Sequence, residues 1–208
     1  MASTIIHLAI AKKILEQVKV KRPKDYFLGA IAPDISKQIG ETKEKSHFLI
    51  NTHDEIPNID LFIKKYHDFK NNSFDLGYFT HLYADKIWLE DVFFKIVNGR
   101  TIKLLDGTTL ETSGKEIVDM LYSDYTNLNT KIIEEYDLDL SLFYDEFTVP
   151  KTNIQEIPVD KLDILINKMS ILIENCKNEK TYTIDMQIIN EYIEHTTKEI
   201  LKIIKEQD

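Results

Sequence analysis

The sequence is poor in the residues that build disulfide frameworks and tight turns. It has a single cysteine, Cys176, with six glycines and five prolines in 208 residues. One cysteine excludes an internal disulfide framework and is typical of a protein in a reducing cytoplasm. So few glycines and prolines argue against a sheet-rich fold with many turns. We therefore expect one mainly helical domain over residues 1–208.

Positive charge and long apolar runs are also scarce. The chain has 26 Lys and Arg against 35 Asp and Glu, a formal net charge of −9, and so lacks the basic footprint of a duplex nucleic acid partner. A bound metal would still supply local positive charge for a small phosphate substrate. No apolar run is long enough for a transmembrane segment, and the N-terminus, MASTIIHLAIAKK, lacks the basic start of a signal peptide. These features predict a cytoplasmic protein and leave its oligomeric state open.

One stretch, residues 73–98, has the features of a central helix. Its sequence, SFDLGYFTHLYADKIWLEDVFFKIVN, has no proline, one glycine and apolar residues at helical spacing. His81 and Asp85 lie four residues apart and therefore share a face. Gly77, one turn earlier, leaves room on that face for a metal or for a neighbouring backbone. A buried His and a buried Asp need partners, and a divalent metal would satisfy both.

Helical periodicity extends over most of the remaining chain. We expect further helices at about 4–18, 59–69, 115–136, 159–176 and 184–206, with Ser3 or Thr4 as the first cap, and a candidate helix at 138–147. Residues 100–112 differ, because Asp106-Gly107 between β-prone runs is a strong hairpin signal. The predicted fold class is all-α: a multi-helix bundle with one small β-hairpin insertion near residues 100–112.

Three further residues of the metal-ligand type lie near the N-terminus. His7 falls on the apolar side of the first helix, where a core histidine that donates to a carbonyl is the commoner role. Asp34 follows Pro33, and a helix N-cap is its commoner role. His47 stands between the charged segment 40–46 and an apolar run, where a surface histidine and a residue at the mouth of a site are about equally good interpretations.

Together, these residues form a donor set that suits a metal. The set is His7, Asp34, His47, His81 and Asp85. Histidine and carboxylate ligands are those that zinc and similar divalent ions use where thiolates are absent. Ligands from four segments suit a site in the core of a helix bundle, with His81 and Asp85 as its rigid platform.

The order of these residues resembles the zinc-dependent phospholipase C superfamily, which includes fungal single-strand-specific nucleases. The resemblance is carried by a His near the start of the first helix, followed by the segments GAIAPDI, SHF and GYFTHLYAD. It implies a helical fold that holds clustered zinc ions. It also implies that His7 binds one zinc, that Asp34, His47 and His81 bind a second, and that Asp85 bridges the two.

The chain also departs from the pattern of that superfamily. Members use the amine and carbonyl of an N-terminal residue exposed by signal-peptide removal, whereas Met1-Ala2 stands here several residues before His7. Their remaining zinc site uses a His soon after the His-xxx-Asp motif and then a His-xxx-Glu. Asp91 occupies that distance here, and no His-xxx-Glu follows. We therefore expect one or two divalent ions, with zinc as the first candidate.

The leading hypothesis is a metal-dependent hydrolase, specifically a phosphoesterase that acts on a small phosphate-containing substrate or a lipid headgroup. Two adjacent ions would lower the pKa of a bridging water, and Asp34 or Asp85 would accept its proton as the catalytic carboxylate. The alternative is a non-catalytic helical binding protein with a residual structural metal. An HD-type phosphohydrolase built on His53 and Asp54 is the weakest alternative, because Pro57 indicates a turn there.

Overall fold

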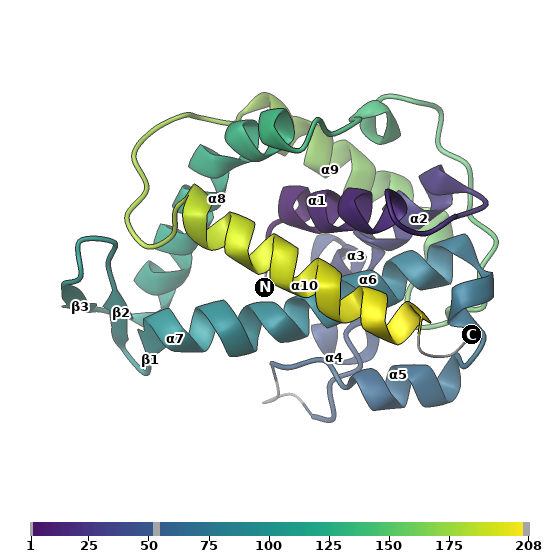
Figure 1. Cartoon of the computed structure of the whole chain (residues 1–208), viewed down its shortest axis with the longest axis horizontal. Helices are drawn as coiled ribbons and strands as arrows, with labels where there is room; N and C mark the ends of the chain where they lie inside the picture. The colour runs from purple at the N-terminus through teal and green to yellow at the C-terminus, as the bar shows by residue number, and fades with distance from the viewer. Residues whose placement is uncertain (1, 52–54, 206–208) are drawn as a thin grey trace.

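The structure is a computed structural model that describes residues 2–51 and 55–205. It is built mainly from helices (Figure 1), which confirms the predicted all-α class. In chain order the elements are α1 (Thr4–Leu15), α2 (Pro23–Gly29), α3 (Ile35–Gln38), α4 (Lys43–Ser46), α5 (Ile59–Lys65), α6 (Ser73–Trp88), α7 (Phe94–Ile96), β1 (Val97–Asn98), β2 (Thr101–Lys103), β3 (Thr109–Glu111), α8 (Gly114–Glu135), α9 (Leu162–Glu174) and α10 (Met186–Lys205).

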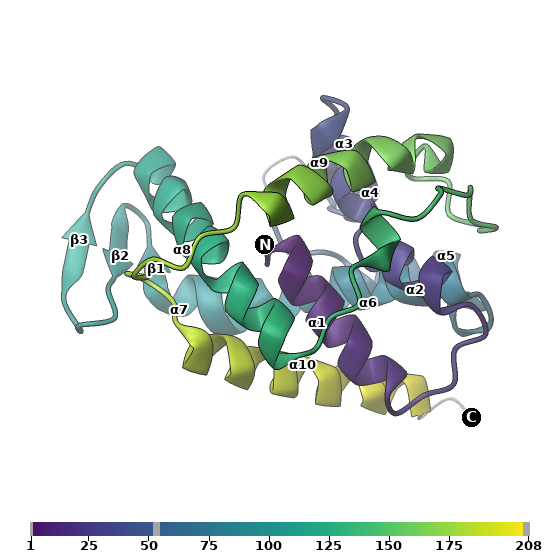
Figure 2. The same cartoon turned by 90° about the horizontal axis from the view of Figure 1, so that it is seen from above.

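Helix α6 lies at the centre of the fold. Helices α1, α2, α5 and α10 all pack against it, and Figures 1 and 2 show it crossing the molecule beneath α1 and beside α10. The side chain of Asn72 caps its start by accepting from the N–H groups of Phe74 and Asp75 at 2.9 and 3.3 Å. Buried side chains lie all round α6, because neighbours cover it on every side. The helix can therefore hold polar side chains away from water.

Helices α2 and α6 cross in backbone contact, because each carries a glycine at the crossing. A Cβ added to Gly77 would overlap the carbonyl oxygen of Tyr26, and a Cβ added to Gly29 would overlap that of Phe74. Of the two uses predicted for the space at Gly77, the structure shows the neighbouring backbone. The crossing fixes α2, and the segment that follows it, against α6.

The central helix ends earlier than predicted. Helix α6 ends at Trp88, a π-helical turn occupies Leu89–Phe93, and residues 97–98 form strand β1 instead of the last turn of a helix. The cause is a strand contact: Val97 pairs with Ile102, whose side chain is fully buried. Pairing with a later segment therefore overrides the helical pattern of residues 97–98.

The predicted hairpin is present, and β1 adds a third strand to it. Strands β2 and β3 are antiparallel, with Thr101 opposite Glu111. In the connecting loop Gly107 has a φ of 86°, a left-handed conformation that glycine adopts without a steric penalty. The sheet order is β1-β2-β3, and the sheet lies at one end of the molecule (Figure 1).

Local capping sets the start of α1 as predicted, whereas two other predicted helices are shorter in the structure. Ser3 caps α1 by accepting from the N–H of Ile6, as predicted. The helix expected at 59–69 ends at Lys65. The candidate helix at 138–147 is a single 3₁₀ turn, Ser141–Phe143, in which Phe143 is the buried residue.

The last three helices close the bundle. Helices α8 and α10 pack on α1, and α10 also packs on α6. The hydroxyl of Tyr192 donates to the carbonyl oxygen of Ala84 at 2.7 Å, which ties α10 to the central helix. Within residues 2–51 and 55–205, no helix combines the length and the apolar character that a bilayer crossing requires.

We expect Gly77→Ala to lower the free energy of unfolding by about 3 kcal/mol, because the new Cβ has to displace the backbone of α2. Gly29→Ala should lower the free energy of unfolding by a similar amount. Gly114→Ala is the matched control: its Cβ enters open space at the start of α8 and should change stability by less than about 0.5 kcal/mol. Urea denaturation measures the free energy of unfolding of all three variants. Equal stability of Gly77→Ala and Gly114→Ala would contradict a tight crossing.

Candidate metal centre

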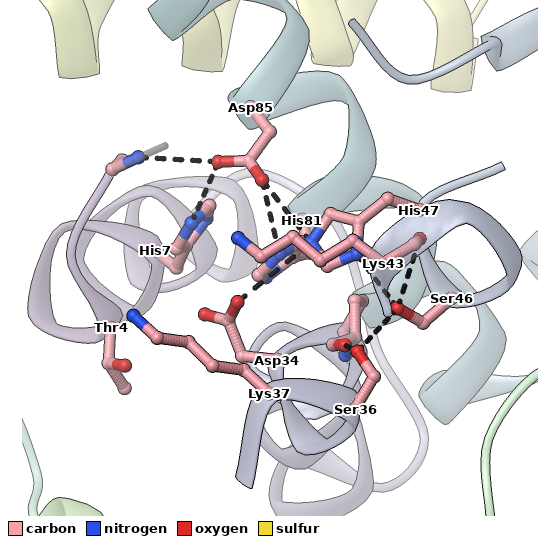
Figure 3. A network of polar contacts seen from close by, with 12 residues as sticks. Thr4, His7, Asp34, Ser36, Lys37, Lys43, Ser46, His47, His81 and Asp85 are labelled. Carbon is pink, nitrogen blue, oxygen red and sulfur yellow. Dashed lines mark hydrogen bonds and ion pairs between the residues drawn. The ribbon is translucent and has the colours of Figure 1, made fainter. Parts of the chain in front are cut away.

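Five polar side chains converge between α6 and the N-terminal part of the chain (Figure 3). They are His7 from α1, Asp34 from the 3₁₀ turn that follows α2, His47 directly after α4, and His81 and Asp85 from α6. Four of them are at most 1% exposed, whereas the side chain of Asp34 is 16% exposed. The structure thus brings together every residue of the predicted donor set, with one carboxylate accessible to solvent.

Asp85 occupies the middle of this cluster. Its Oδ1 lies 3.3 Å from His7 Nε2 and accepts from the backbone N–H of Ala2 at 3.3 Å. Its Oδ2 lies 3.5 Å from both His47 Nε2 and His81 Nε2. The two carboxylate oxygens therefore face different histidines, which is the arrangement a bridging ligand needs.

The three N-terminal members do not have the commoner roles that their sequence context also allowed. His7 faces Asp85, and neither of its ring nitrogens has a hydrogen-bond partner, so it is no core histidine bonded to a carbonyl. The side chain of Asp34 makes no capping bond at the start of α3. His47 is buried, so the surface interpretation is wrong. All three side chains are directed to the cluster.

Two sets of ligand atoms in the cluster are compact enough to share one ion each. The first is His7, His81 and Asp85; the second is Asp34, His47 and His81; within each set the atoms lie within 4.8 Å of one another. His81 belongs to both, yet it offers one nitrogen only, because its Nδ1 contacts the carbonyl oxygen of Ala30. Asp85, with two oxygens, is the residue that can reach two ions at once.

A backbone carbonyl fixes the orientation of His81. The Nδ1 of His81 lies 2.9 Å from the carbonyl oxygen of Ala30. A carbonyl only accepts, so Nδ1 carries a hydrogen and Nε2 faces the cluster. The close crossing of α2 and α6 supplies this contact, because Ala30 directly follows the glycine of α2 at the crossing. Such an outer hydrogen bond is what sets the ring orientation of metal-binding histidines.

Two serines, which sequence analysis missed, orient His47. Its Nδ1 lies 2.8 Å from Ser46 Oγ, which lies 2.8 Å from Ser36 Oγ. Ser36 donates to the carbonyl oxygen of Pro33 at 3.1 Å. Each hydroxyl has one proton to donate. Because Ser36 donates to Pro33, Ser46 has to donate to Ser36 for their contact to be a hydrogen bond. His47 Nδ1 is then the donor in its contact with Ser46. Nε2 of His47 then faces the cluster without a proton. The only sequence signal was the position of Ser46 directly before His47.

Buried polar atoms without a hydrogen-bond partner gather where these residues meet. They are His7 Nδ1 and Nε2, His47 Nε2, His81 Nε2 and Asp85 Oδ2. An unpaired buried polar group costs roughly 1–3 kcal/mol, so this arrangement is unfavourable without a cation or additional protons. Imidazole nitrogens and carboxylate oxygens are the atoms that zinc binds when thiolates are absent. The residues present therefore fit a divalent metal.

The electrostatics of the cluster prepare it for a cation. Burial opposes ionisation of Asp85, but His81 and His7 hold its pKa well below the ordinary value. Burial also opposes ionisation of Asp34, and there His81 and His47 lower the pKa in spite of it. Burial lowers the pKa of His7 and that of His47, the latter to about 3, and His81 adds to both effects. Burial also opposes protonation of His81, yet the Asp85 carboxylate raises its pKa. Metal ligands must be deprotonated, and the lowered pKa values of His7 and His47 favour that state for these two rings.

Two hollows reach the cluster. The larger, about 380 Å³, includes His47 and a mostly apolar wall to which the π-helical turn at Leu89–Phe93 contributes. The smaller, about 120 Å³, includes Asp34. Tyr122 and Tyr125 of α8 line both. Solutes can therefore approach the cluster from two directions, which a purely structural core would not need.

Other ligand-type residues lie apart from the cluster. His67 is 79% exposed. Asp91, at the distance where the family pattern has a further ligand, instead contacts His195 Nε2 at 3.3 Å near the surface. His53 and Asp54 fall outside the residues that the structure describes, so their position away from the site stays a prediction.

Comparison with known proteins gives one match. Residues 6–88 match a family model described as zinc dependent phospholipase C. That segment contains every member of the cluster and ends with α6. No curated protein and no solved structure matches significantly. Together with the buried His and Asp cluster, the family match supports a divalent metal and a metal-dependent hydrolase in the general sense.

We expect zinc to raise the melting temperature of the protein, and Asp85→Ala to lose this rise, because Asp85 contacts the three histidines of the cluster. A ligand that binds only the folded state stabilises it by about 2.7 kcal/mol at a hundred times its Kd. For a chain of this length that corresponds to a shift of roughly 5–10 °C.

Scanning calorimetry with and without added zinc measures this shift. His67→Ala, at an exposed position, is the matched control and should keep the full zinc-dependent rise. The metal centre would be refuted by a wild-type protein that shows no shift with zinc, or by an Asp85→Ala variant that shifts as much as the wild type.

Proposed function

We propose that this chain, whose residues 6–88 match the family model of zinc dependent phospholipase C, is a phosphoesterase that works with one or two divalent ions, zinc being the first candidate. The observation that carries this proposal is the position of Asp85, whose Oδ1 faces His7 and whose Oδ2 faces His47 and His81. It supports a scheme in which His7 holds one ion, Asp34, His47 and His81 hold a second, and Asp85 bridges them.

Asp34 is the carboxylate best suited to proton transfer. A divalent ion bound in the cluster would polarise a phosphoryl oxygen and lower the pKa of a water. Asp34 is partly exposed and lines the smaller hollow, so it can meet a water that enters from solvent. Its neighbours keep its pKa below the ordinary value despite burial, so at neutral pH it is ionised and able to accept a proton.

Hydrolysis then follows a balanced course. The P–O bond to the alcohol breaks, the water oxygen bonds to phosphorus, and Asp34 takes the water's proton and returns it to the leaving alcohol oxygen. Asp85 has no solvent access, so it orients the histidines and does not exchange protons with solvent. The contacts of Ala30 with His81 and of Ser46 with His47 hold both rings in place before substrate arrives, which limits reorganisation during the reaction.

A non-catalytic binding protein with a structural metal is the second candidate. It is favoured by Asp91, which forms ion pairs with His195 at 3.3 Å and Lys95 at 2.9 Å instead of joining the cluster. Structural zinc sites are closed by four protein ligands, however. The partial exposure of Asp34 and the two hollows are better explained by a site that admits a substrate.

We expect Asp34→Asn to lower kcat about 100- to 1,000-fold towards p-nitrophenyl phosphate or bis-p-nitrophenyl phosphate, the size of effect that loss of a general base produces. Asp160→Asn, at an exposed position that lines neither hollow, is the matched control and should retain wild-type activity. Steady-state kinetics are measured beside zinc content, so that loss of metal is not mistaken for loss of the base.

Chelation should abolish the activity, and added zinc should restore it. A wild-type protein that holds zinc but hydrolyses neither a phosphate monoester nor a diester would favour the structural metal. An Asp34→Asn variant that retains zinc and full activity would exclude Asp34 as the base.

A further inference from the structure

Lys37 is held in a defined position at the smaller hollow. Its Nζ donates to the hydroxyl of Tyr122 at 2.6 Å and lies 4.6 Å from the centre of that ring. Lys37 and Asp34 both line this hollow, and among its described lining residues Lys37 is the one cation. A lysine that is already restrained loses less conformational freedom when it binds a ligand. It is therefore well prepared to bind an anion next to Asp34.

Lys43 is a second cation beside the cluster. It begins α4, four residues before His47, and lines the larger hollow. In the view of Figure 3, the side chains of Lys37 and Lys43 lie on either side of Asp34. Each of the two hollows thus has one lysine in its lining, Lys37 in the smaller and Lys43 in the larger.

The two hollows differ in size and in charge. The smaller, about 120 Å³, is below the roughly 300 Å³ at which pockets hold drug-sized ligands, whereas the larger, about 380 Å³, exceeds it. Glu44 and Glu55 line the larger hollow beside Lys43 and outweigh its charge. A small anionic group is therefore favoured in the smaller hollow, and an uncharged, mostly apolar group in the larger.

We propose that the substrate is a phosphate monoester, whose doubly charged phosphoryl group faces Lys37 in the smaller hollow, with Lys43 as a second cation, and whose alcohol part occupies the larger hollow. This inference rests on the proposed function, because it concerns the same site. A monoester carries more negative charge near neutral pH than a diester, and three terminal oxygens for charge-assisted hydrogen bonds. The two lysines would act as substrate-binding residues that select for this charge.

Binding of two phosphate probes to zinc-loaded protein tests the proposal without measuring turnover. Inorganic phosphate at pH 8 represents the doubly charged group, and dimethyl phosphate represents a diester with one charge. Calorimetry should show that the wild type binds phosphate at least about tenfold more tightly. Lys37→Gln should weaken phosphate binding about tenfold, the loss expected for one hydrogen bond to a charged group, and leave dimethyl phosphate within about threefold of the wild type.

Lys43→Gln should also weaken phosphate binding, but less than Lys37→Gln does, because Glu44 and Glu55 share the hollow of Lys43. Lys45→Gln is the matched control: Lys45 is an exposed lysine of the same helix, α4, and lines neither hollow. It should leave the affinity for both probes unchanged. Zinc content is measured for each variant before titration, so that a change in the metal is separated from a change in anion binding.

The outcomes separate this inference from the proposed function. A wild-type protein that takes up no zinc overturns both. A zinc-loaded wild type that binds the two probes equally overturns the monoester assignment and leaves a diesterase in place. If Lys45→Gln weakens phosphate binding as much as Lys37→Gln, the effect comes from general charge and the role of Lys37 is overturned. Loss confined to Lys37→Gln and Lys43→Gln, with zinc retained, supports the proposal.

Discussion

Backbone contact between α2 and α6 is the constraint on which the candidate metal centre depends. The glycines Gly29 and Gly77 allow it, because any side chain at either position would overlap the opposite backbone. Ala30 follows directly and places its carbonyl oxygen 2.9 Å from His81 Nδ1; the turn that carries Asp34 begins two residues later. A larger residue at the crossing would therefore move one ligand and release the ring of another. Stability and site geometry are linked through a single pair of glycines.

The cluster is costly to the protein unless something binds there. His47 Nε2, His81 Nε2 and Asp85 Oδ2 are buried without hydrogen-bond partners, and well-packed apolar residues in place of buried charges are often neutral or stabilising. A sequence selected only for stability would not keep five such residues in its core. Local violations of packing rules of this kind are expected at functional sites. The same atoms become ligands when a divalent ion binds, so the unfavourable arrangement is itself an argument for a metal.

Much of the fold was predictable, because apolar residues at helical spacing also face the core in the structure. The convergence of the five cluster residues could be expected from their apolar surroundings and their order along the chain. The strand at residues 97–98 could not, since it depends on the pairing of Val97 with Ile102, and neither could the π-helical turn before it. Ser36 and Ser46 were missed because their role exists only once α3 and α4 bring the two hydroxyls within 2.8 Å.

A net charge of −9 does not conflict with an anionic substrate, because the charges that decide binding are local. At physiological ionic strength, exposed charges are screened over about 8 Å, so the many surface carboxylates act weakly on a group held inside the smaller hollow. A divalent ion bound in the cluster would offset the charges of Asp34 and Asp85. Lys37 would then add positive charge that Tyr122 already holds in place. Local attraction combined with an acidic exterior would admit a small phosphate and disfavour a polyanionic duplex.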